Sequence, residues 1–142
     1  MPRCFLDANV LFYACDTTDA SKQQTAKELI LDASLKCEGV VSVQVLGEFF
    51  NATVHGKNRF LTPDEAERLI HDYAKLLEVV TVDWIALPKA IAIHRTYQTK
   101  IFDSLHLAVA GQCECMEFLS EDLTDGQLYD GVRVRNPFRA AP

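Results

Sequence analysis

The sequence predicts an α/β domain with a mostly parallel sheet of four to five short strands. Short apolar runs alternate along the chain with segments whose apolar residues recur at helical spacing. The runs carry few polar residues, which is typical of strands that helices cover on both faces. Parallel strands need crossover connections, so helices are expected on the faces of the sheet. The expected strands are residues 3–6, 40–43, 79–82, 116–119 and 132–134.

Two crossover helices are expected in the first half of the chain, in addition to the helix that begins after Asp7. Ser21 and Gln24 form a capping-box pattern at the start of a helix that ends near Gly39. Residues 43–54 follow the second expected strand, and their apolar side chains recur at helical spacing. Both segments are long enough to serve as crossovers.

The clearest helix signal lies in the middle of the sequence. Thr62 can cap a helix, Pro63 suits its first position, and Glu65 completes a capping box. Asp83 is expected to cap the next helix, in which Pro88 marks a kink or a restart.

The C-terminal third begins with a helix that is apolar almost all round and is expected to start at Asp103. From Asp122 to Pro142 the chain is rich in turn residues, which favours irregular structure around one edge strand. The whole is expected to form one domain over residues 1–138, with 139–142 as a short tail.

Composition excludes several classes of protein. The chain has 142 residues, of which 49% are hydrophobic and 24% charged, so it can bury a core and is not a disordered chain. Carboxylates interrupt the apolar runs, so we expect no membrane or secretory segment and a cytoplasmic location. The cysteines are odd in number and lack zinc-ribbon spacing, which favours reduced thiols. They are Cys4, Cys15, Cys37, Cys113 and Cys115.

The net charge of −6 argues against a passive nucleic-acid coat, which would need net basic charge. It does not exclude catalysis on nucleic acid, because divalent ions would neutralise carboxylates gathered in one site. The positions of the carboxylates therefore matter more than their total.

Four carboxylates have positions that suggest a site. Asp7 and Asp122 each follow an expected strand, at the edge where open parallel sheets bind ligands. Glu48 lies on a polar helix stripe without Lys or Arg, and Asp103 begins an apolar helix. Each also has an ordinary interpretation: a helix cap for Asp7 or Asp103, a solvated face for Glu48, and a turn for Asp122.

Taken together, these residues predict a site for a hard divalent cation. Clusters of carboxylate oxygens bind Mg²⁺ or Mn²⁺ and leave positions open for water and phosphate. Such an ion can activate water and offset charge on a phosphate, so metal-assisted phosphodiester hydrolysis is the chemistry that the pattern favours.

The chain resembles the PIN-domain ribonucleases, most closely the toxins of VapBC toxin–antitoxin pairs. The resemblance spans residues 3–138 and is carried by segments 5–14, 42–51, 102–105, 119–123, 126–127 and 132–138. It implies a PIN-like three-layer α/β/α fold and an Mg²⁺-dependent endoribonuclease, with Mn²⁺ as an alternative ion. It further implies an RNA substrate, a homodimer, and a small VapB-like antitoxin bound across the active-site groove.

The resemblance places the family's acidic motif on Asp7, Glu48, Asp103 and Asp122, with Asp125 as an auxiliary metal ligand. These residues are expected to hold the metal and to carry catalysis.

Three polar residues are expected to support the carboxylates by hydrogen bonds, namely Asn9, Asn51 and Ser120. Ala8 departs from the family, in which Ser or Thr often stands beside the first Asp. His106 follows Asp103 by three residues and could face the site from one helical turn on, although a packed core histidine is the favoured interpretation. Trp84 is interpreted as a core or dimer contact rather than a base-stacking platform.

Six basic residues are candidates for phosphate contacts, but each also fits an ordinary surface charge. They are Lys57, Arg59, Lys100, Arg133, Arg135 and Arg139.

Two other classes of function compete with the nuclease. A non-catalytic module would bind RNA or a protein through the same groove without cutting. A haloacid-dehalogenase-type phosphatase would use Asp7 as a phosphoryl acceptor, but that chemistry needs a second Asp where this chain has Asn9.

Overall fold

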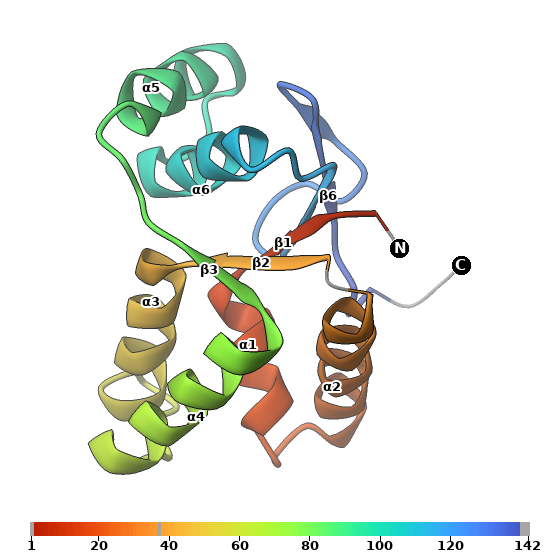
Figure 1. Ribbon diagram of the computed structural model, residues 1–142, viewed down its shortest axis with the longest axis vertical. Coiled ribbons are helices and arrows are strands. Elements are labelled where there is room, and N and C mark those ends of the chain that lie inside the picture. Colours follow the sequence, from red (N-terminus) through yellow and green to blue (C-terminus); the bar gives the residue numbers. More distant parts are fainter. Residues whose placement is uncertain (1, 37, 140–142) are drawn as a thin grey trace.

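The computed structural model describes residues 2–36 and 38–139 and shows a sheet between two layers of helices (Figure 1). The predictions made for Cys37 and for residues 140–142 of the tail lie outside the described residues. In chain order the elements are β1 Cys4–Leu6, α1 Ala8–Cys15, α2 Ala20–Leu35, β2 Gly39–Ser42, α3 Val43–Val54, α4 Pro63–Leu76, β3 Glu78–Val80, α5 Ala86–Tyr97, α6 Ile101–Gln112, β4 Glu117–Leu119, β5 Leu128–Tyr129 and β6 Val132–Arg135.

The predicted three-layer α/β/α fold with a mostly parallel sheet is confirmed. The sheet has the strand order β3-β2-β1-β4-β6-β5, and its pairs are parallel except for β5 with β6. Helices α1 to α4 cover one face, and α5 and α6 cover the other (Figure 1). Because β1, β2 and β4 are neighbours and run in parallel, their carboxyl ends share one edge of the sheet.

The core forms where the central strands meet the helices. Phe5 of β1 pairs in register with Val40 of β2 and Phe118 of β4. The rings of Phe5 and Phe118 stack with centroids 5.6 Å apart, and both side chains are fully buried or nearly so. This packing of large apolar groups fixes the strand ends from which the carboxylates project.

Three expectations about the strands were wrong. β6 is not an edge strand, because the two-residue strand β5 pairs with it in antiparallel fashion. Asp130 and Gly131 join them with positive φ angles of 48° and 88°, the backbone that a tight hairpin turn requires. Among the residues that the structure describes, the sheet therefore has six strands rather than four to five. β3 is not covered on both faces, since it lies at the sheet edge and is mostly exposed.

The helices agree with the expected ones, but several begin at other residues. α2 is capped by Asp19, whose side chain accepts from the N–H of Lys22 at 3.0 Å, and not by Ser21. α6 begins at Ile101, so Asp103 lies in its first turn and does not cap it. Pro88 also lies in a first turn, that of α5, where its missing N–H has no helical partner to lose, and the helix continues unbroken to Tyr97.

Asp83 does not cap α5 through its side chain, since this helix begins at Ala86 with no side-chain cap. The capping box of Thr62 and Glu65 is present at the start of α4.

Four of the predicted free thiols are described, and all four are free: Cys4, Cys15, Cys113 and Cys115. Cys113 caps the end of α6 ahead of the buried Cys115, as expected for a junction between helix and strand. Within residues 2–36 and 38–139, every helix is too short or too polar to cross a lipid bilayer.

The cap of α2 gives a test of the fold. Asp19→Ala removes the oxygen that satisfies the N–H of Lys22 and should lower the free energy of unfolding by about 1 kcal/mol. Ser21→Ala changes an exposed residue and should shift it by less than about 0.5 kcal/mol. Urea denaturation followed by circular dichroism measures both, and equal effects would show that Asp19 is not the cap.

Candidate functional site

Asp7 follows β1 directly and is buried, with 5% of the residue exposed. Its Oδ1 accepts a hydrogen bond from the N–H of Ala8 at 2.7 Å and so caps α1. Its Oδ2 accepts another from the hydroxyl of Ser120 at 2.7 Å. The cap and the site are therefore compatible roles, because each uses a different oxygen.

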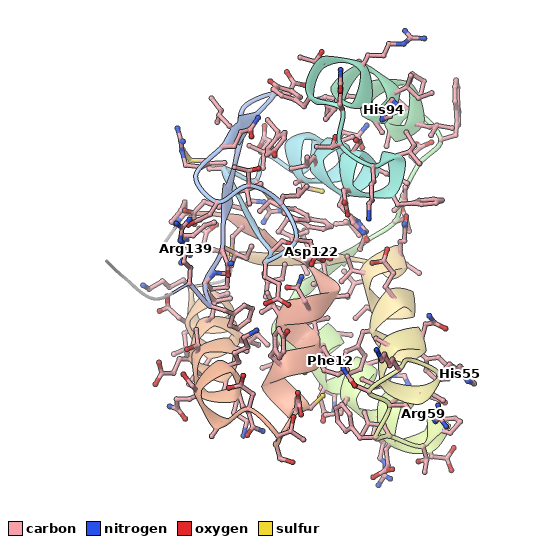
Figure 2. The ribbon with its side chains drawn as sticks, turned by 180° about the vertical axis from the view of Figure 1, so that it is seen from behind. Phe12, His55, Arg59, His94, Asp122 and Arg139 are labelled. Carbon is pink, nitrogen blue, oxygen red and sulfur yellow. The ribbon has the colours of Figure 1, made fainter. Side chains whose placement is uncertain are left out.

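Ser120 and Asn9 tie Asp122 to the same place. Ser120 is buried just after β4, and its Oγ accepts from the N–H of Asp122 at 3.1 Å. The amide of Asn9 donates to Asp122 Oδ2 at 3.1 Å and to Ser120 Oγ at 3.3 Å. The predicted contacts of Asn9 and Ser120 with the carboxylates are thus present, and Figure 2 labels Asp122 in the middle of the molecule, beside α1.

Glu48 on α3 contacts His106 on α6. The Oε1 of Glu48 lies 2.9 Å from His106 Nε2 and also accepts from the amide of Gln44 at 3.2 Å. His106 is 2% exposed and lies near the rings of Phe5 and Phe118, with centroids 6.1 and 6.2 Å away. The expectation of a packed core histidine was therefore incomplete, because this buried ring also points a nitrogen into the site.

The tightest group in the site consists of Asp7, Glu48 and His106, each of which offers one ligand atom within 4.8 Å of the other two. Asp103 lies one helical turn before His106 on α6 and is half-buried. Carboxylate oxygens suit Mg²⁺ and Mn²⁺, and an imidazole nitrogen is also a common metal ligand. The donor set therefore fits a divalent cation.

Burial and mutual repulsion act against the charges of two of these carboxylates. Burial raises the pKa of Asp7, and the charge of Asp122 adds to the rise although His106, Ser120 and Ala8 oppose it. Burial likewise raises the pKa of Asp103, and the charges of Asp122 and Glu48 act in the same direction. Both shifts mean that the ionised site is costly without a cation.

Glu48 and His106 form the one pair here that favours ionisation of both partners. Burial raises the pKa of Glu48, but the hydrogen bond and charge of His106 outweigh it, so the net shift is downward. Burial lowers the pKa of His106, but Glu48, Asp7 and Asp103 outweigh it, so the net shift is upward. His106 is thus one basic ring that faces three acidic groups, Asp7, Glu48 and Asp103.

Two predicted site residues lie apart from this group. Asp125 accepts from the N–H of Asn136 at 2.9 Å and lies 3.5 Å from Arg139, so it holds the C-terminal turn. Asn51 is exposed, and its side chain makes no hydrogen bond within the described part of the chain. The structure therefore gives neither residue a contact with Asp7 or Glu48.

Several of the basic candidates already have partners. Arg135 pairs with Glu117 at 3.3 Å, and Arg133 donates to the carbonyl of Gly126 at 2.6 Å. Lys57, Arg59 and Lys100 are exposed.

Trp84 is 76% exposed, so the interpretation as a core residue was wrong. The alternative of a dimer contact stays a prediction.

A family model described as "PIN domain" matches residues 4–123. No curated protein matches the sequence significantly.

Solved structures share the fold at low sequence identity. A toxin–antitoxin complex from Klebsiella pneumoniae aligns with a TM-score of 0.68 and 17% identity, over 94% of this chain and 97% of that one. A DNA-bound VapBC from Salmonella typhimurium aligns with a TM-score of 0.68 and 15% identity, over 96% of this chain and 99% of that one. VapC20 of Mycobacterium tuberculosis, a toxin that cleaves the sarcin–ricin loop, aligns with a TM-score of 0.55 and 19% identity, over 81% of this chain and 86% of that one.

The buried charge of Asp7 predicts a stabilising substitution. Because folding raises the pKa of Asp7, its ionisation costs stability once the pH exceeds the ordinary range of an aspartate. Asp7→Asn keeps an oxygen for the cap and removes that cost, so the metal-free protein should melt about 2–4 °C higher at pH 7. Calorimetry in EDTA measures the shift.

The same shift should disappear in acid, where Asp7 is protonated in both states. The exposed Asp72→Asn on α4 is the matched control and should leave the melting temperature unchanged. Destabilisation of the metal-free protein by Asp7→Asn at pH 7 would contradict the account of the charge.

Proposed function

The chain belongs to the PIN-domain family, and we propose that it is a divalent-metal-dependent endoribonuclease, the toxin of a toxin–antitoxin pair. The observation that carries this proposal is that Asp7, Glu48 and His106 each offer a ligand atom within 4.8 Å of the other two. The charge of Asp122 also acts on the pKa of both Asp7 and Asp103, which supports a place for all four carboxylates in one site. The neighbours named as toxins, one of which cleaves an RNA loop, support RNA as the substrate.

Asp7 and Glu48 would hold the cation, with Asp103 and Asp122 completing the acidic ring around it. When bound, Mg²⁺ or Mn²⁺ would lower the pKa of a coordinated water and offset charge on the scissile phosphate. The protein's own residues set the geometry: Ser120 fixes one oxygen of Asp7, Asn9 holds Asp122, and His106 orients Glu48.

The same proposal includes two protein partners. The neighbours solved as toxin–antitoxin complexes support a small antitoxin that covers the active-site groove. A homodimer is supported by a run of exposed apolar side chains between β3 and the first turn of α5, namely Trp84, Ile85 and Leu87.

A non-catalytic binding module is the second candidate. The observation that favours it is the pairing of His106 with Glu48, which offsets part of the negative charge without a metal. A module of this kind would bind RNA equally well in EDTA and would leave it uncut.

The phosphatase is the weakest candidate. The residue two positions after Asp7 is Asn9, whose amide is already donated to Asp122 and Ser120 and cannot serve as an acid.

RNA cleavage tests the leading proposal. End-labelled RNA should be cut with Mg²⁺ or Mn²⁺ and not with EDTA. Asp7→Asn should slow cutting about a thousandfold or more, since the site loses several kcal/mol of transition-state stabilisation. Asp72→Asn is the control and should cut at the normal rate, and full activity of folded Asp7→Asn would refute the assignment.

His106 gives a separate test of how Glu48 is positioned. His106→Ala should lower the rate of cleavage about 10- to 100-fold and raise the metal concentration needed for half-maximal activity. His106→Gln retains a donor and should recover part of the loss. Metal titrations of the cleavage rate measure both effects. An unchanged metal requirement in His106→Ala would show that the contact with His106 does not position Glu48 for metal binding.

A further inference from the structure

A cavity of about 280 Å³ lies between α1 and the loop that follows α3, and its lining begins at Ala8 and Asn9, the two residues after Asp7. Its lining includes Asn9, Phe12 and Tyr13 of α1, Ala52 of α3 and Lys57 of the loop. Figure 2 shows Phe12 on the side of α1 that faces α3. The volume is near the lower limit of small-molecule pockets and suits one ring system.

The aromatic walls of this cavity are held by other contacts. The ring of Phe12 meets that of Phe60 edge-on, with centroids 5.3 Å apart. The hydroxyl of Tyr13 donates to Glu121 at 2.6 Å and accepts from Lys22 at 3.2 Å. The aromatic side chains of the cavity are therefore already positioned to pack against a planar ligand before it binds.

The cavity and the carboxylate group share a residue. Asn9 lines the cavity and also donates its amide to Asp122 and Ser120. Phe12 follows Asp7 by five residues, or about 7.5 Å along a helix axis. A strand whose phosphate lies at the carboxylates can therefore reach the cavity with a group on an adjacent nucleotide.

The cavity lining includes the basic residue Lys57, and Arg59 follows two residues later in the same loop. Lys57 and Arg59 are exposed in the loop, and the sequence has no acidic residue between Glu48 and Asp64. In a chain with a net charge of −6, this stretch is unusually basic. Positive charge beside a metal-binding group of carboxylates suits a polyanion that passes from one to the other.

We propose that this cavity is the subsite for an unpaired nucleobase of the RNA, on a nucleotide adjacent to the scissile phosphate. Phe12 and Tyr13 supply apolar ring surface for the base, and Lys57 contacts its phosphate. Single-stranded RNA is recognised in this way, with splayed bases packed on aromatic side chains. The proposal rests on the proposed ribonuclease function and adds a determinant of its specificity.

A rival occupant is an aromatic side chain of a protein partner. It would use the same apolar walls, but it would leave Lys57 and Arg59 without an anion. These two basic residues and the shared Asn9 therefore favour a nucleotide.

Binding can be measured without cleavage. ¹⁵N-labelled protein in Mg²⁺ buffer is titrated with AMP, GMP, CMP and UMP, with ribose 5-phosphate as the probe that lacks a base. At least one nucleotide should shift the amide signals of Ala52, Gly56 and Lys57 saturably and more strongly than ribose 5-phosphate, which can contact only Lys57. Shifts from none of the nucleotides, or equal shifts from ribose 5-phosphate, would overturn the subsite. Equal or stronger shifts from N-acetyltryptophanamide would assign the cavity to a protein partner.

Substitutions then locate the binding. Ala52→Leu fills the cavity and should weaken the best nucleotide at least tenfold, whereas Ala74→Leu on the exposed face of α4 should not. Lys57→Gln should weaken binding of the phosphate, and the exposed Lys75→Gln on α4 is its control. Phe12→Leu removes an aromatic wall and replaces Ala52→Leu if that variant does not fold. Unchanged affinity in folded Ala52→Leu or Phe12→Leu would overturn the proposal.

Cleavage of RNA with randomised positions separates this inference from the proposed function. A base preference at a position next to the cut, lost in Ala52→Leu and kept in Ala74→Leu, supports the subsite. Cleavage with no base preference would overturn the subsite proposal without contradicting the proposed ribonuclease function. If the protein cuts no RNA, the proposed function fails, and the nucleotide titration still decides whether the cavity binds a base.

Discussion

The structure depends on the placement of buried negative charge at one edge of a parallel sheet. Asp7 lies at the end of the central strand, and the packing of Phe5 against Phe118 allows it little freedom to move toward solvent. Its oxygens are satisfied by Ala8 and Ser120, but hydrogen bonds do not remove the charge. The fold therefore holds an electrostatic cost that a divalent cation would relieve, and it keeps the oxygens in place for one.

This cost explains why the surrounding polar residues form a connected set. Ser120 contacts both Asp7 and Asp122, Asn9 contacts Asp122, and His106 contacts Glu48. These residues come from the ends of two strands and from three helices, so the site is rigid only when all the layers pack. The buried carboxylates destabilise the folded state, and packing of the core compensates for this cost, as is common at functional sites.

Much of this arrangement could be predicted from the sequence, because it follows from local patterns. An aspartate at the end of an apolar strand or within a few residues of it lies near the carboxyl edge, and this reasoning predicted the positions of Asp7 and Asp122. The contact between His106 and Glu48 joins residues 58 positions apart and depends on how α6 packs against α3, which no local pattern shows. β5 has only two residues, too few for a periodic signal, and the cap at Asp19 competed with an equally good pattern at Ser21. The apolar cavity could not be predicted for the same reason as the contact between His106 and Glu48. Its lining residues come from elements far apart in the sequence, so no local pattern indicates it.

The most direct test of the account is the position of a metal ion. Crystals of the protein soaked in Mn²⁺ and measured at the manganese absorption edge should show an anomalous peak between Asp7 and Glu48, about 2.1 Å from their oxygens. The peak should be absent from crystals of Asp7→Asn treated in the same way. A fully ordered site with no peak near these residues, or peaks only on the outer surface, would contradict the claim that the carboxylates converge to hold a cation.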